Sequence, residues 1–162
     1  MPTARSSLRV ELSESLIPSL QAIGFTGPSA ISGNALLHKF KRPGSRGSQV
    51  VTVQLEKNGL PRFVLGLVVE PSEGFEAVRE RGGIVRQGRV QPKRGKSTRA
   101  WFRADPEFWK RVIGKSASTE KQAVSACVAL LPEVEAWWHT EASSEHITVF
   151  EMKYPGPKHA VA

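Results

Sequence analysis

The chain contains a single cysteine, Cys127, so no disulfide can form within it, and this scarcity is typical of proteins from a reducing compartment. It also lacks any run of about 18 apolar residues, the length that a membrane-spanning helix needs. Its first residues contain no apolar core of a secretory signal. These absences predict a cytoplasmic protein that does not insert into a membrane.

The sequence offers little that supports catalysis. The four histidines stand at no metal-binding spacing, so we expect no metal site and no cofactor. Val90 occupies the position where a P-loop ending in Gly95-Lys96-Ser97 would need its first glycine, and no Gly-x-Ser-x-Gly motif is present. The residues therefore favour a protein that is not an enzyme, while a catalytic site assembled only by folding stays open.

Acidic residues are scarce in one part of the chain. Between Arg81 and Lys115 there are eleven basic and two acidic residues, a formal charge of +9, whereas the remaining residues together carry −1 of the total +8. A local basic field attracts phosphates, anionic lipid or an acidic protein surface. The alternative is a hydrated, solvent-facing loop with no partner, and the sequence leaves both open.

The opening segment has the pattern of an amphipathic helix. Leucine or isoleucine recurs over residues 8–23 at steps of four, four, four and three. We expect Ser6 or Ser7 to cap this helix, Pro18 to kink or restart it, and Gly24 to end it.

Strands are predicted through the middle of the chain. The segments with strand patterns are Ala35–Arg42, Gln49–Lys57, Arg62–Glu70, Ile84–Gln91, Arg99–Arg103 and His146–Met152. Asn58-Gly59 predicts a type I′ hairpin between two antiparallel strands, with Val53 and Phe63 near the same core. The segment 62–70 is apolar on both faces, as is typical of a central strand.

Shorter helices are expected at about 71–80, after Asp105-Pro106, and from Thr119 onward with an interruption at Pro132. Cys127 lies on the apolar face of that late helical segment, so we expect it to be buried. Trp137 and Trp138 are adjacent, and we expect one of them to be exposed to a partner.

This order of elements predicts an α+β fold, with a central, mostly antiparallel sheet of four to six strands. An N-terminal helix and late helices should pack mainly on one face of the sheet. We expect a single domain over residues 1–154 and a flexible C-terminal tail over 155–162.

Scattered apolar and glycine positions follow an order that is similar to a known family. They are the leucine-rich opening helix with Gly24-Phe25, Phe40, Val51-Thr52-Val53-Gln54, Leu65-Gly66-Leu67, Arg86 and Arg89, Trp101-Phe102, and Trp137-Trp138. This order resembles the small bacterial proteins grouped as domain of unknown function 4304 and, more loosely, the immunity proteins of bacterial toxin systems. The resemblance covers most of residues 8–140 and implies an α+β fold with no settled chemistry and no transferable functional residue. Pro132 and the basic stretch 93–99 depart from it.

The basic segment supplies the candidate binding residues. They are Arg89, Lys93, Arg94, Lys96, Arg99 and Trp101. Arg86 and Arg89 are three apart on a strand and should point to opposite faces, so only one of them can extend the patch. Our leading hypothesis is a non-catalytic protein, possibly of the immunity or inhibitor type, that binds a protein with an acidic surface. The alternative is a nucleic-acid-binding module that uses residues 86–103, with Trp101 stacking on a base.

Overall fold

The protein has the α+β architecture that the sequence predicts. The structure is a computed structural model that describes residues 3–93, 100–105 and 119–157. The sheet follows the order β1-β2-β3-β4-β6, all pairs are antiparallel, and β5 also pairs with β3. The strands are β1 Leu37–Gly44, β2 Gly47–Leu55, β3 Arg62–Glu70, β4 Gly83–Val90, β5 Phe102–Arg103 and β6 Ile147–Tyr154.

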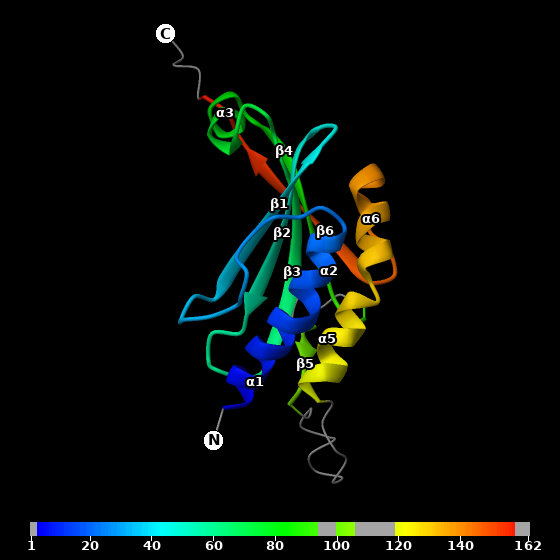
Figure 1. The fold of residues 1–162 in the computed structure, drawn as a ribbon. Helices are drawn as coiled ribbons and strands as arrows, with labels where there is room; N and C mark the ends of the chain where they lie inside the picture. The colour runs from blue at the N-terminus through cyan, green and yellow to red at the C-terminus, as the bar shows by residue number, and fades with distance from the viewer. Residues whose placement is uncertain (1–2, 94–99, 106–118, 158–162) are drawn as a thin grey trace.

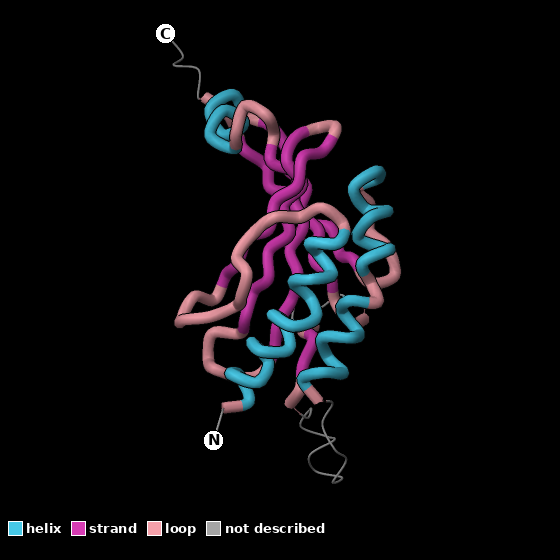
Figure 2. Tube along the Cα trace, viewed as in Figure 1, coloured by secondary structure: helices cyan, strands magenta, loops and turns pink. Residues whose placement is uncertain are grey.

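The helices gather mainly on one face of this sheet, as Figures 1 and 2 show. They are α1 Ala4–Glu11, the π-helical turn η1 Leu12–Leu16, α2 Ile17–Ala22, α5 Glu120–Val128 and α6 Leu131–Thr140, with α3 Phe75–Arg81 at one end of the sheet. Within the described ranges, no helix is long and apolar enough to cross a membrane.

The opening helix is interrupted where proline predicts it. Pro18 lies in the first turn of α2, directly after the π-helical turn, because proline has no N–H for the preceding turn. The expected caps at Ser6 and Ser7 are wrong. Thr3 is the cap, because its backbone is extended and its hydroxyl accepts a hydrogen bond from the Ser6 N–H.

The hairpin between β2 and β3 joins adjacent antiparallel strands, as predicted, but it is not a two-residue type I′ turn. Gly59 has φ +86, whereas Asn58 does not have the positive φ that this turn type requires. The strands pair with Leu55 opposite Phe63, so the core residues of both strands face the helices. A two-residue turn would shift the register by one and place Phe63 on the opposite face.

Of the strand predicted over Arg99–Arg103, the described residues form only the two-residue strand β5, which pairs with β3. On β3, Leu65 pairs with Val90 of β4, and Phe63, two positions earlier, pairs with Phe102 of β5. If β4 continued past Val90, its residue 92 would be the partner of Phe63. The actual partner, Phe102, is ten positions further along the chain. β4 and β5 therefore lie on a single line of pairing with β3, and the ten residues 92–101, called the excursion, come between them in the sequence.

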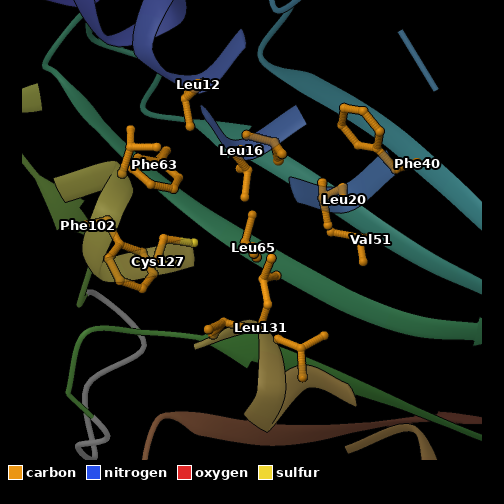
Figure 3. Close-up of a cluster of buried hydrophobic side chains, with 14 of the residues drawn as sticks. Leu12, Leu16, Leu20, Phe40, Val51, Phe63, Leu65, Phe102, Cys127 and Leu131 are labelled. Carbon is orange, nitrogen blue, oxygen red and sulfur yellow. The ribbon is translucent and has the colours of Figure 1, made fainter. Parts of the chain in front are cut away.

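The core lies between the sheet and the helices, and Figure 3 shows part of it. Leu8, Leu12, Leu16 and Leu20 are fully buried against strand residues, and Cys127 is buried as predicted. The prediction that one of Trp137 and Trp138 is exposed is wrong. Both are buried, since Trp137 contacts β4 near Gly88 while Trp138 packs beside Phe25.

Two sequence expectations lie outside the described residues. They are the helix after Asp105-Pro106, which falls in 106–118, and most of the basic loop, which falls in 94–99. The C-terminal tail is described only as far as residue 157.

Candidate binding surface

The face of the sheet opposite α1, α2, α5 and α6 is called the open face here. Because side chains alternate along a strand, the pairing register decides which residues share it. One row of paired residues crosses β1, β2, β3, β4 and β6: Lys39, Thr52, Gly66, Arg89 and Thr148. The neighbouring row is Lys41, Val50, Val68, Gln87 and Phe150. The open face thus combines cations with apolar side chains.

A groove of about 310 Å³ lies on this face beside α3. Its lining includes Lys39, Thr52, Gly66, Phe75, Arg79, Met152 and Tyr154. Gly66 has no side chain to fill the groove, and there is no room for one, since a Cβ at this position would lie 2.4 Å from Thr52 Oγ1. The groove therefore places two cationic side chains, Lys39 and Arg79, beside an apolar floor and wall.

The cations around the groove differ in how strongly they are engaged. Lys41 donates to Glu70 at 3.1 Å. Arg79 lies 3.3 Å from Glu76 in an exposed pair, a kind of contact that contributes little to stability. Lys39 has no carboxylate partner within the described part of the chain. Lys39 and Arg79 are thus available to a ligand.

Arg89 and Trp101 meet on the same face, close to Gly66. The Arg89 guanidinium carbon lies 4.9 Å from the centre of the Trp101 ring, a cation–π contact. Burial lowers the pKa of Arg89, and its Nε is shielded from water with no acceptor among the residues described. An incoming anionic group could satisfy this donor.

Two further arginines of the open face are bound to one carboxylate. Asp105 accepts hydrogen bonds from Arg62 Nη2 at 2.6 Å and from Arg103 Nη2 at 2.7 Å. Burial alone would raise the pKa of Asp105, but these arginines lower it below its ordinary value. This cluster fastens β5 to β3 rather than offering free charge.

The structure brings together two of the residues that the sequence selects. Arg89 and Trp101 are in contact, and Arg86 lies on the opposite face, 3.3 Å from Glu151, as the strand geometry predicts. Lys93 is exposed and lines a separate pocket with Ser144, Glu145 and His146. Arg94, Lys96 and Arg99 lie outside the described residues.

The groove residues were missed by the sequence reasoning, although two signals pointed to them. Lys39 alternates with the buried His38 and Phe40, which places this lysine on the face away from the core. Gly66 stands inside a strand, where glycine often marks the close approach of another group. No local signal could have placed Arg79 of α3 beside these strands, because that contact depends on the tertiary fold.

Glu133 has a structural role at the start of β6. Its carboxylate accepts hydrogen bonds from the Ser144 hydroxyl and from the His146 N–H, and it lies 2.7 Å from His146 Nδ1. Burial would raise the pKa of Glu133, but these hydrogen bonds lower it. Elsewhere in the described ranges, no three His, Cys, Asp or Glu side chains are grouped closely enough to hold a metal ion.

Comparisons of the chain with protein-family models, with curated proteins and with solved structures find no match. The resemblance to the domain of unknown function 4304 therefore stays a hypothesis. Functional inference rests on the geometry of the open face.

Proposed function

We propose that this protein is a non-catalytic binding module, of the immunity or inhibitor type, whose open face binds an acidic surface of a protein partner. The observation that carries the proposal is the groove, in which Lys39 and Arg79 lie beside apolar side chains on the face of the sheet away from α1, α2, α5 and α6. Apolar contact at the centre with cations at the rim suits a partner that presents carboxylates around an apolar residue.

The charge of the open face supports an acidic partner. Its strands contribute five cations. Glu70 pairs with Lys41, and Asp105 pairs with Arg62 and Arg103, so two of the five have no carboxylate partner among the described residues. The cations are Lys39, Lys41, Arg62, Arg89 and Arg103. Such a field speeds the encounter with an acidic surface and disfavours basic partners.

The test is affinity purification from native lysate on the immobilised protein, with nuclease present. The groove variant carries Lys39→Ser and Arg79→Ser, both at exposed positions. The matched control carries Lys121→Ser and Arg86→Ser, which remove the same charge away from the groove. We expect an acidic protein to be retained by the wild type and the control and lost from the groove variant. Equal retention by all three would overturn the proposal.

A second candidate function, binding of single-stranded nucleic acid, is favoured by the contact between Arg89 and Trp101. An aromatic ring beside a cation on an open sheet can stack on a base while the cation meets a phosphate. The probe is a fluorescent oligothymidylate, read by anisotropy over a range of salt concentrations. For this function, log affinity should fall by about 0.7 per phosphate contact per log unit of salt. Arg89→Gln should reduce that slope, and an absence of binding at low salt would exclude the candidate.

A further inference from the structure

A cationic pocket lies at the end of the molecule where α1 begins, separate from the open face. It has a volume of about 480 Å³, and its lining includes Thr3, Arg5, Ser6, Arg9, Asn34 and Lys57. Three of these side chains are cations and none is a carboxylate. The pocket is formed where α1, the loop before β1 and the turn after β2 come together (Figure 1).

The fold holds two of the cations side by side. Arg5 and Arg9 are four residues apart on α1, so they lie on the same helix face, where like charges repel. Burial lowers the pKa of Arg9, and the charge of Arg5 lowers it further. The turn between β2 and β3 lies beside Arg5, since a Cβ on Gly59 would be 3.9 Å from Arg5 Nη1.

These two arginines also lack the acceptors that other arginines have. Arg42, Arg46 and Arg62 each lie within 3.2 Å of a carboxylate oxygen. Arg9 Nη2 donates to the Ala35 carbonyl, at 3.2 Å. Arg5 Nε, Arg5 Nη2 and Arg9 Nη1 are shielded from water and have no acceptor in the described part of the chain. Such unsatisfied charged donors are costly, and a bound anion would satisfy them.

The chemistry of the pocket selects the kind of anion. Guanidinium groups bind phosphate oxygens in pairs, and a lysine adds a point charge. Three cations match a dianion better than a single carboxylate. The hydroxyls of Thr3 and Ser6, 2.7 Å apart, offer further polar contacts. The volume exceeds that of a free phosphate and leaves space for an organic group.

We propose that this pocket binds the phosphate group of a small phosphomonoester, with Arg5, Arg9 and Lys57 as its ligands. The unsatisfied N–H groups of Arg5 and Arg9 are the donors that would bind the phosphate oxygens. The pocket is separate from the groove on the open face, so an experiment can disprove this proposal without disproving the proposed function, and the reverse.

The test measures dissociation constants by calorimetry for inorganic phosphate and for glycerol 3-phosphate, with chloride at equal ionic strength as the blank. The wild type should bind glycerol 3-phosphate, and the Arg5→Gln, Arg9→Gln double variant should bind it at least about a hundredfold more weakly, about tenfold for each charged donor. Lys57→Gln, at an exposed position, should weaken binding with the fold intact. Arg86→Gln and the groove variant should bind as the wild type does.

The outcomes that contradict the proposal are distinct. Unchanged affinity in both the double variant and Lys57→Gln would show that phosphate binds elsewhere. Binding of inorganic phosphate without glycerol 3-phosphate would exclude a phosphomonoester. In the absence of ligand, the double variant should unfold at the same or a higher temperature than the wild type, because the repulsion between Arg5 and Arg9 is removed. A large loss of stability would instead assign the two arginines a structural role.

Discussion

Gly88 lies on β4 directly against the indole ring of Trp137. A Cβ at this position would be 3.0 Å from Trp137 Cε2 and 3.2 Å from Ile147 Cγ2, and both of these residues are buried. Gly88→Ala should therefore lower the free energy of unfolding by about 1–3 kcal/mol, because the packed core must shift to admit a methyl group. Urea denaturation measures the change.

A second substitution tests whether the clash with Trp137 is the cause. Trp137→Phe removes the ring atoms that the new methyl group would meet, although the smaller ring leaves a cavity in the core. The double variant should lose less stability than the two single variants combined, as expected for residues in contact. Additive losses would show that the cost at Gly88 arises elsewhere. The sequence could not have indicated this contact, because it depends on how α6 lies across the sheet.

At the scale of elements, Asp105 fastens the two-residue strand β5 to β3. Its pKa is lowered by Arg62 and Arg103 against the opposing effect of burial. A carboxyl group whose pKa is lower in the folded protein stabilises the fold at any pH above its ordinary pKa of 3.8. This stabilisation is lost as the pH falls through the lower pKa of the folded state.

Asp105→Asn should therefore destabilise the protein at neutral pH, by about 1–3 kcal/mol, since two arginines lose a charged acceptor. The difference from the wild type should shrink as the pH falls below 3.8, where the wild-type carboxyl group also becomes protonated. Urea titrations of both proteins at several pH values measure this difference in the free energy of unfolding. A difference that is constant with pH would mean that the ion pairs do not contribute.

The elements differ in how far the sequence predicts them. The leucine spacing and Pro18 are local signals, so the opening helix and its restart were predicted. The hairpin was predicted from Asn58-Gly59, but the predicted type I′ turn was wrong. The apolar residues of β2 and β3 set the register, and the Glu56 carboxylate supports a longer turn by accepting the N–H groups of Asn58 and Leu60. Residue preferences within a turn cannot outweigh the burial of two strands.

At the scale of the whole molecule, the excursion between β4 and β5 can be tested by deletion. Removal of the ten residues Pro92–Trp101 joins Gln91 to Phe102 in the register that a continuous strand would have. The shortened protein should keep its circular dichroism spectrum and unfold within about 1–2 kcal/mol of the full chain, since the contact of Arg89 with Trp101 is the main described interaction lost.

A deletion one residue shorter, Lys93–Trp101, is the matched control. It shifts Phe102 by one position and turns its buried ring towards the open face, so it should be markedly less stable. Equal stability of the two variants would contradict the shared line of pairing.

The α+β class was predictable from the order of patterns along the chain. The alignment of β4 and β5 along β3 was not predictable, because β5 has only two residues and its position depends on contacts with Phe63 and Asp105.

The same alignment makes the protein a natural scaffold for displaying foreign peptides. The ends of the excursion are anchored at Val90 and Phe102, whose partners on β3 are two positions apart. Two residues of strand span about 7 Å, so a peptide inserted there would have its ends held close together. Since the cost of closing a loop rises only slowly with its length, inserts of very different lengths should be accepted without rebuilding the sheet. A library of such inserts would vary recognition while the supporting framework stayed constant.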